Sequence, residues 1–329
     1  MYVTTRIMER RLVAPFTIAS GVRRTQRSIR VEITDDAGKT GVGEASGVAY
    51  RGETPETMAS AVAEVAPHIE THADRQSLRS IMPPGGARAA IDAALWHLES
   101  SEGRPAWRLA GLKAAPKPVA TATTISLGAP ITMGRHALSV ADRPLLKVKL
   151  GRPDGVDAER ARAVRVAAPN ATLIADGNGG CSAETLPSLA AALADLGYKL
   201  LEQPLPPGAD QALRDMNLPI PLCADESLHT CNDMEAVRGI YQYGNIKLDK
   251  SGGLTEAMDL ADALDDCGMK LFVGCMLGGS VSIAPAFLLT PDASFVDLDG
   301  PLWMAEDSSV LRLNKDDRLP PPALSVWGG

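Results

Sequence analysis

The sequence predicts an α/β protein with a parallel β/α barrel, and two observations carry this prediction. The first is a series of short apolar runs that each end in a charged residue, at steps of 27, 26, 23 and 22 positions. These residues are Lys149, Asp176, Glu202, Asp225 and Lys247. A strand, a loop, a helix and a second loop need about that many residues. The second observation is that Ala-rich segments with helical patterns lie between the runs, as an outer layer of helices requires.

The N-terminal part of the chain has the pattern of a separate α+β domain, which we expect over residues 1–115. Three segments alternate between apolar and polar residues as strands do, and they cover 2–13, 29–35 and 40–46. A turn at residues 35–38 joins the last two as a hairpin. Two helical patterns follow, over 54–72 and 87–100.

Eight short β-rich runs follow from Val119 onward, and they predict the eight strands of a barrel domain over residues 119–303. The segment between the two domains, 113–118, contains two prolines and is predicted to be a linker. The tail, 304–329, has no helical pattern, and we expect it to pack back on the first domain. A length of 329 residues agrees with two domains of ordinary size.

Composition excludes several classes of partner. The formal net charge is −7 and the isoelectric point is near 5.3, so no basic patch is available for nucleic acid. The five cysteines are scattered without a CxxC spacing, which is typical of a reducing compartment rather than of a disulfide framework. No apolar signal core and no stretch of ~20 apolar residues is present. We therefore expect a cytoplasmic protein that does not bind membranes and acts on a small molecule.

Three acidic residues at the ends of consecutive strand runs predict a metal site. Asp176, Glu202 and Asp225 should project into the barrel mouth, where the carboxyl ends of parallel strands meet. Oxygen ligands alone favour Mg²⁺ over zinc. Each acid by itself could be a helix N-cap, but caps have no reason to recur at the same strand end. Asn178 and Glu226 lie just beyond two of these ligands and are candidates to orient them.

Two lysines on one strand predict a catalytic base. Lys147 and Lys149 are two positions apart, so both side chains should point into the barrel. Two neighbouring ammonium groups repel, and we expect this to lower the amine pKa toward the range in which a lysine takes a proton. Lys247 should face the site from across the mouth. The alternative is a pair of solvated lysines at a strand end.

Two further acids lie on the last strand run. Asp297 and Asp299 share the i, i+2 spacing, so both can face the mouth. This pair could hold an ammonium group of a substrate. The alternative is a turn, because Asp-Gly is a common turn dipeptide.

The segments KVK, DGN, EQP, ADES and IKLDKSGG, in this order, resemble the enolase superfamily and its muconate-lactonizing-enzyme-like subgroup. GVGEA and AIDAALWHL resemble the capping domain of that family. The resemblance implies an α+β capping domain over a modified TIM barrel, (β/α)₇β. It also implies Mg²⁺ on the three carboxylates and acid/base roles for Lys149 and Lys247. Lys250 does not match a family position of this kind.

The segment DLDG resembles the Asp-x-Asp by which dipeptide epimerases of this subgroup bind the amino terminus of a dipeptide. It implies 1,1-proton transfer at the α-carbon of the C-terminal residue, as in relatives that act on L-Ala-D/L-Glu. Those relatives commonly have an arginine in the cap loop that contacts the Glu side chain. Here Ser20 stands at that place, so Arg23 or Arg24 is the expected substitute.

Other activities stay open at this point. Muconate cycloisomerase, o-succinylbenzoate synthase and N-acylamino-acid racemase use the same scaffold, metal and lysines. A lysine Schiff-base barrel enzyme is an alternative of another class, and a ligand-binding barrel without activity is a third. The sequence leaves open which dipeptide is preferred and whether the chain forms a homo-oligomer.

Overall fold

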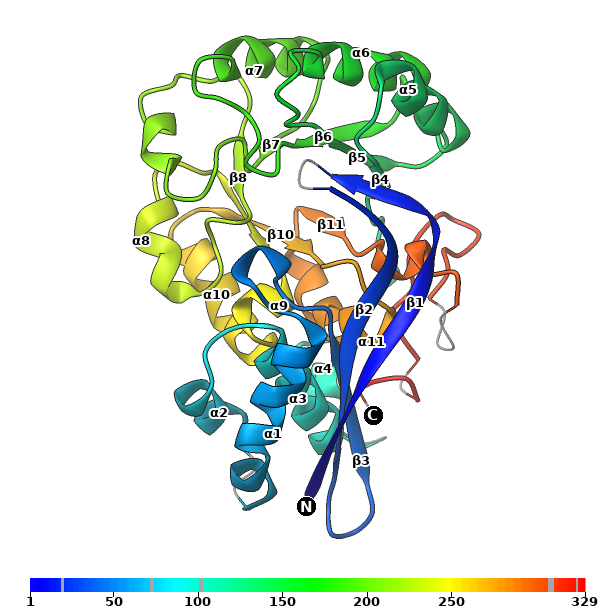
Figure 1. The fold of residues 1–329 in the computed structure, drawn as a ribbon, viewed down its shortest axis with the longest axis vertical. Coiled ribbons are helices and arrows are strands. Elements are labelled where there is room, and N and C mark those ends of the chain that lie inside the picture. The colour runs from blue at the N-terminus through cyan, green and yellow to red at the C-terminus, as the bar shows by residue number, and fades with distance from the viewer. Residues whose placement is uncertain (19–20, 72–73, 101–102, 307–310, 324, 329) are drawn as a thin grey trace.

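The computed structural model describes residues 1–18, 21–71, 74–100, 103–306, 311–323 and 325–328. A three-stranded antiparallel sheet with three helices forms one part, and an eight-stranded parallel sheet surrounded by helices forms the other (Figure 1). The predicted fold class, an enolase-type barrel with an α+β cap, is confirmed. Among the described residues, no helix is long and apolar enough to cross a lipid bilayer.

The cap sheet is built on a long hairpin. Its strands are β1 (Tyr2–Ile18), β2 (Gly21–Thr34) and β3 (Thr40–Ala45), in the order β1-β2-β3. Both strands of the hairpin run past the predicted bounds of 13 and 29. The alternation fails there because the first five residues of β2 are all exposed, so no apolar face marks the strand. The hairpin therefore reaches the barrel mouth, where Leu127 N donates to Thr17 O after β4 (2.9 Å).

The helices of the cap are α1 (Pro55–Thr71), α2 (Arg75–Ile81) and α3 (Gly86–Glu99). The sequence analysis predicted α1 and α3 but not α2, whose seven residues are too few for a clear period. Helix α3 is buried on every face from Gly86 to Trp96 because it lies between the cap sheet and the barrel. Strand β3 packs closely on it: a Cβ at Gly43 would lie 2.0 Å from Ala90 O.

The eight predicted barrel strands are all present, and neighbours in sequence are neighbours in the sheet. They are β4 (Thr123–Ile125), β5 (Leu145–Lys149), β6 (Thr172–Asp176), β7 (Leu201–Glu202), β8 (Leu222–Ala224), β9 (Tyr243–Ile246), β10 (Lys270–Gly274) and β11 (Phe295–Asp297). Between β4 and β11, Ala122 N donates to Val296 O (2.7 Å) and Leu298 N donates to Thr121 Oγ1 (2.8 Å). These bonds close the barrel, so that all strand ends meet at one mouth.

Helices of unequal length cover the barrel. The α-helices are α4 (Ala106–Leu109), α5 (Pro130–Ser139), α6 (Asp157–Ala167), α7 (Leu186–Asp195), α8 (Met234–Val237), α9 (Leu248–Ser251), α10 (Leu254–Asp266) and α11 (Ser280–Ile283). Short 3₁₀ segments complete the layer: η2 (Asp210–Leu213), η3 (Cys231–Asp233), η4 (Ala284–Asp292) and η5 (Gly300–Trp303), with η1 (Ala49–Arg51) in the cap. A small apolar core fills the barrel interior: Ala122, Leu145, Ile174, Leu200, Cys223 and Phe272. Below the mouth, the interior is therefore mostly apolar, although the amine of Lys147 lies over Phe272.

Polar contacts of α3 hold the cap against the barrel. Arg88, buried in this interface, donates to the carbonyl oxygens of Ser251 and Gly252. Asp92 accepts from the backbone N–H and the hydroxyl of Thr255. The cap therefore contacts the segment that directly follows β9, which bears Lys247.

The C-terminal tail contacts both parts of the molecule. Ala305 N donates to Arg11 O in the cap hairpin (2.9 Å), and Leu319 pairs with Val119 at the start of the barrel region. Trp327 Nε1 donates to Ala93 O of α3 (3.0 Å). The domain limits at residues 115, 119 and 303 stay predictions.

A pH dependence follows from Asp92. Burial raises its pKa to about 6, and the hydrogen bonds from Thr255 offset only part of that rise. A carboxyl whose pKa is raised on folding contributes stability below its unfolded pKa, and this contribution is lost as the pH rises through the folded pKa. Between pH 5 and 7.5 the protein should lose about 1 to 2 kcal/mol of unfolding free energy relative to Asp92→Asn. Urea unfolding of both proteins in EDTA measures the difference, and parallel pH profiles would contradict it.

Candidate active site

Three carboxylates meet at the mouth of the barrel. Asp176 ends β6, Glu202 ends β7 and Asp225 follows β8, and neighbouring parallel strands place them side by side. One oxygen of each lies within 4.8 Å of the others, and none of the three residues is more than 1% exposed. The structure therefore brings the predicted ligand set together.

Lys147 lies at the centre of this group. Its amine donates to Glu202 Oε1 and Asp297 Oδ2 at 3.0 Å each, and it is 3.1 Å from Asp176 Oδ2. The amine also lies above the ring of Phe272, 5.3 Å from its centroid, on the inner core. Lys147 is thus a fixed counter-charge for the carboxylates.

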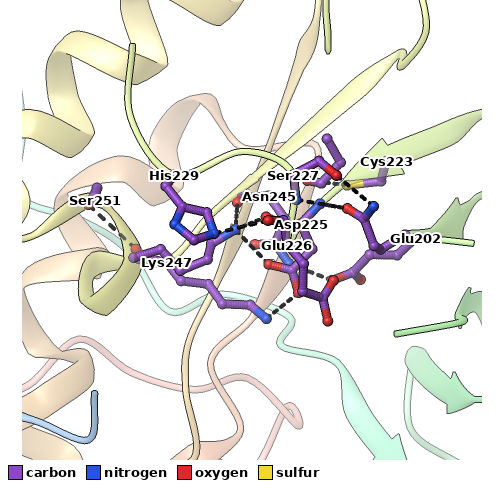
Figure 2. A network of polar contacts seen from close by, with 12 residues as sticks. Glu202, Cys223, Asp225, Glu226, Ser227, His229, Asn245, Lys247 and Ser251 are labelled. Carbon is purple, nitrogen blue, oxygen red and sulfur yellow. Dashed lines mark hydrogen bonds and ion pairs between the residues drawn. The ribbon is translucent and has the colours of Figure 1, made fainter. Parts of the chain in front are cut away.

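The other two predicted lysines flank the carboxylates from opposite sides. Lys149, at the end of β5, donates to Asp176 Oδ2 (2.6 Å). Lys247, just after β9, donates to Asp225 Oδ2 (Figure 2). Strands β5 and β9 are four positions apart in the ring of eight, so these amines face each other across the mouth. Such a pair can approach one carbon atom from two faces.

The predicted lowering of the lysine pKa is wrong for this arrangement. Burial lowers the pKa of Lys147, but Asp297, Glu202 and Asp176 outweigh it and raise the pKa well above its usual value. Burial is likewise outweighed at Lys247, where Asp225 raises the pKa. The amines of Lys147 and Lys247 each have a carboxylate in direct contact, and at these two residues this attraction exceeds the repulsion between amines.

The three carboxylates differ in how easily they ionise. Burial and repulsion by Asp176 raise the pKa of Glu202 to about 8, although Lys147 opposes this. At Asp176 burial is outweighed by Lys149 and Lys147, which lower the pKa to about 2. Glu202 Oε2 has the Lys147 amine 2.8 Å away but accepts no hydrogen bond. Three crowded oxygen ligands, one of them difficult to ionise, fit a divalent cation such as Mg²⁺.

Asn178 and Glu226, predicted to orient the ligands, contact each other. Asn178 Nδ2 donates to Glu226 Oε1 (3.1 Å), and Asn178 N donates to Asp176 Oδ1 (2.9 Å). Burial and the charge of Asp225 raise the pKa of Glu226 to about 7. Asn178 Oδ1 and Glu226 Oε2 are buried without a hydrogen bond. Both side chains therefore keep an acceptor for a ligand.

The sequence analysis missed three residues that support the carboxylates. Gln203 Oε1 accepts from Asp225 N (2.9 Å), Asn245 Nδ2 donates to Glu202 Oε1 (2.8 Å), and Lys250 Nζ donates to Asp225 Oδ1 (2.6 Å). Asn245 was detectable, because it stands two positions before Lys247 and strand alternation puts both on one face. Gln203 and Lys250 lie beyond the ends of β7 and β9, so the alternation of strand side chains does not predict the direction in which they point.

Asp297 and Asp299 have different surroundings. Asp297 Oδ2 accepts from Lys147, whereas its Oδ1 is buried without a hydrogen bond. Asp299, which directly precedes η5, accepts through Oδ2 from Thr124 N (2.9 Å) and from Nε1 of Trp303 at the end of η5 (3.1 Å). Burial and the charge of Asp297 raise the pKa of Asp299 to about 6. Asp297 thus keeps one carboxylate oxygen without a hydrogen-bond partner among the described residues.

A cavity of about 350 Å³ lies between the cap and the barrel mouth. Both flanking lysines line it, together with residues of the cap: Phe16, Ile18, Arg23, Gly47, Ala49 and Tyr50. Arg23 lines the cavity and Arg24 does not, since consecutive residues of a strand point to opposite faces. Asp297 and Asp299 are not among the lining residues, and Ser20 lies outside the described residues.

The fold and this arrangement of acids and lysines define a class of protein. Residues 2–111 match the mandelate racemase / muconate lactonizing enzyme N-terminal domain, and residues 133–319 match the enolase C-terminal domain-like family. The chain belongs to the enolase superfamily.

Several similar proteins within the superfamily are epimerases or racemases of amino acid derivatives. The chain is 42% identical to the L-Ala-D/L-Glu epimerase of Escherichia coli K12, over 90% of this chain and 92% of that protein. It is 40% identical to an N-acetyl-D-glutamate racemase of a Pseudoalteromonas species, over 77% and 79%. A solved enolase family member from Agrobacterium tumefaciens, with homology to dipeptide epimerases and with sodium and L-Ala-L-Glu bound, superimposes with a TM-score of 0.95 at 38% identity over 99% of both chains.

Metal binding should be measurable without turnover. Because the three carboxylates repel one another, adding Mg²⁺ to EDTA-treated protein should raise its unfolding free energy, by about 2.7 kcal/mol at a concentration 100 times the Kd. Glu202→Gln should remove most of this gain. The exposed Glu159→Gln is the matched control and should respond as the wild type does. A gain of equal size in Glu202→Gln would exclude Glu202 as a ligand.

Proposed function

We propose that this protein is a Mg²⁺-dependent dipeptide epimerase that inverts the α-carbon of the C-terminal residue, with dipeptides of the L-Ala-D/L-Glu type as preferred substrates. The observation that carries the proposal is the pair Lys149 and Lys247, which face each other across the carboxylates and line one cavity. Inversion needs a base on one face of the carbon and an acid on the other.

Asp176, Glu202 and Asp225 would hold the metal, which when bound supplies positive charge where negative charge develops on the substrate carboxylate. One of these ligands, Asp225, raises the pKa of Lys247. With a cation bound, Asp225 would hold the Lys247 amine less strongly in its protonated form. One lysine then takes the α-proton, and the other returns a proton to the opposite face.

The remaining residues would bind the two ends of the substrate. The unpaired Oδ1 of Asp297 supports a site for the ammonium group of the substrate. Asp299 lies close enough to Asp297 to add its charge to this site. Arg23 supports recognition of the glutamate side chain, because it brings a cation into the cavity from the cap. Lys147 would neutralise Glu202 and Asp297, to which its amine donates, and would present a positive charge to the substrate.

The exchange reaction tests the two lysines separately. Lys149→Ala and Lys247→Ala should each lower racemisation by at least about 10²-fold, because each removes the acid or base of one face. The lysine that remains should still exchange the α-proton of one enantiomer with deuterium from D₂O, which NMR detects. Lys270→Ala, at the opposite end of the barrel, is the control and should keep the wild-type rate. Near-normal turnover in either active-site variant would remove that lysine from the mechanism.

N-acylamino-acid racemisation is the second candidate, since one relative is an N-acetyl-D-glutamate racemase and Asp297 already has Lys147 as a cation. The two candidates differ in the charge of the substrate nitrogen. If a free ammonium group is bound, N-acetylation of L-Ala-L-Glu should lower kcat/KM by about 10- to 150-fold, the loss of one charge-assisted contact. Asp297→Asn should cost free dipeptides a similar factor while Mg²⁺ affinity stays near that of the wild type. Faster turnover of N-acetyl-glutamate than of L-Ala-L-Glu would favour the second candidate.

The other activities have less support. Substrates of muconate cycloisomerase and o-succinylbenzoate synthase have no ammonium group for Asp297. A Schiff-base enzyme has no need of three buried carboxylates in one cluster, whereas Asp176, Glu202 and Asp225 form such a cluster here. Borohydride in the presence of substrate should therefore leave the protein mass unchanged.

A further inference from the structure

Tyr50 brings a hydroxyl group to the cavity from the cap. It lies in η1, shortly after β3, and lines the cavity together with Arg23 and Lys247. Its hydroxyl is 3.1 Å from Nε2 of His229, which belongs to the loop after β8. The direction of this hydrogen bond decides what Tyr50 can offer to a substrate.

The neighbours of His229 determine which ring nitrogen carries the hydrogen. Arg51 Nη1 lies 2.7 Å from His229 Nδ1, and a guanidinium group can only donate, so Nδ1 is an acceptor without a hydrogen. Nε2 lies 3.0 Å from the carbonyl oxygen of Glu226, which can only accept (Figure 2). His229 is therefore a neutral imidazole with its hydrogen on Nε2.

An Nε2 that carries a hydrogen has no lone pair, so the Tyr50 hydroxyl cannot donate to it and can only share, as an acceptor, the hydrogen that Nε2 also directs at the Glu226 carbonyl oxygen. The hydrogen of the Tyr50 hydroxyl stays available. Among the residues that the structure describes, this hydroxyl has no second hydrogen-bond partner. A tyrosine hydroxyl ordinarily has a pKa near 10, so it keeps its hydrogen at neutral pH.

We propose that Tyr50 is a specificity-determining residue that donates a hydrogen bond to the side-chain carboxylate of the substrate's C-terminal residue, and that His229 and Arg51 hold it as a donor. This inference rests on the proposed function. A hydroxyl that can only donate at this place favours a substrate side chain with a hydrogen-bond acceptor. A cationic side chain has only donors and would not be bound by it. The substrate carboxylate at the reacting centre would lie at the metal ligands of the barrel, so the cap wall of Arg23 and Tyr50 faces the side chain.

The test is the selectivity between L-Ala-L-Glu and L-Ala-L-Met, which have side chains of similar length but differ in the acceptor. Tyr50→Phe keeps the ring and removes the hydroxyl, and it should lower the ratio of the two kcat/KM values on the order of 10-fold. The exposed Tyr2→Phe is the matched control and should leave the ratio unchanged. An unchanged ratio in Tyr50→Phe would overturn the proposal, as would an equal loss on both dipeptides, which indicates only a structural role.

His229 is a positioning residue in this proposal, and a conservative variant tests it. In His229→Gln the side-chain amide can still accept from Arg51 and donate to Tyr50, so the wild-type ratio should be largely kept. His229→Leu can do neither and should lower the ratio as Tyr50→Phe does, with no further loss in the double variant. Equal ratios in the Gln and Leu variants would overturn this part.

A binding measurement separates this inference from the proposed function. If the wild type racemises neither dipeptide, the epimerase proposal fails. Calorimetric titration of the Mg²⁺-loaded protein with the same two dipeptides then decides the role of Tyr50. Weaker binding of L-Ala-L-Glu alone in Tyr50→Phe supports it, and equal affinities in wild type and variant overturn it.

Discussion

The structure depends on the balance of buried charges at the barrel mouth. Asp176, Glu202 and Asp225 are almost wholly removed from water, and such groups are tolerated only when a cation is in contact with them. Among the described residues, four buried amines meet this need: Lys147, Lys149, Lys247 and Lys250. Burial nevertheless raises the pKa of Glu202 to about 8, and repulsion by Asp176 adds to the rise, so this carboxylate is costly to ionise. A divalent cation bound to the three carboxylates would offset the costs of burial and of mutual repulsion.

Barrel closure and cap attachment maintain this arrangement. The bonds between β4 and β11 close the ring, which keeps β5 and β9 on opposite sides and the two flanking lysines face to face. Asp249, two residues after Lys247, accepts from the backbone N–H groups of Ser46 (2.8 Å) and Gly47 (2.7 Å) in the cap. One short segment thus carries a candidate base and holds the cap loop that precedes Tyr50. The position of the cavity wall is therefore coupled to the position of the base.

Most of the barrel and of the charged site was predictable, because strand ends recur at a regular step and their residues converge in a known direction. The extension of the cap hairpin was not, since residues 21–25 have no buried face and hence no apolar period. The pKa shift of Lys147 was predicted with the wrong sign, because the sequence places two lysines on one strand but does not show that Lys147 contacts carboxylates on other strands. The choice between Arg23 and Arg24 also required coordinates, since alternation says that they differ but not which one faces the cavity.

Chemistry and selectivity are divided between the two parts of the molecule. The barrel contributes the acids and amines whose charges compensate one another, so a substitution there disturbs several partners at once. The cap contributes Arg23, whose side chain contacts Gln26, and Tyr50, which contacts His229, and neither touches the metal-ligand candidates directly. If the proposed function holds, substitutions at these two positions would change which side chain is accepted while the contacts among the barrel acids and amines stay in place. A family that keeps one proton-transfer centre and varies its substrates would be expected to place the variation in the cap, where a substitution leaves the paired charges of the barrel in contact with one another.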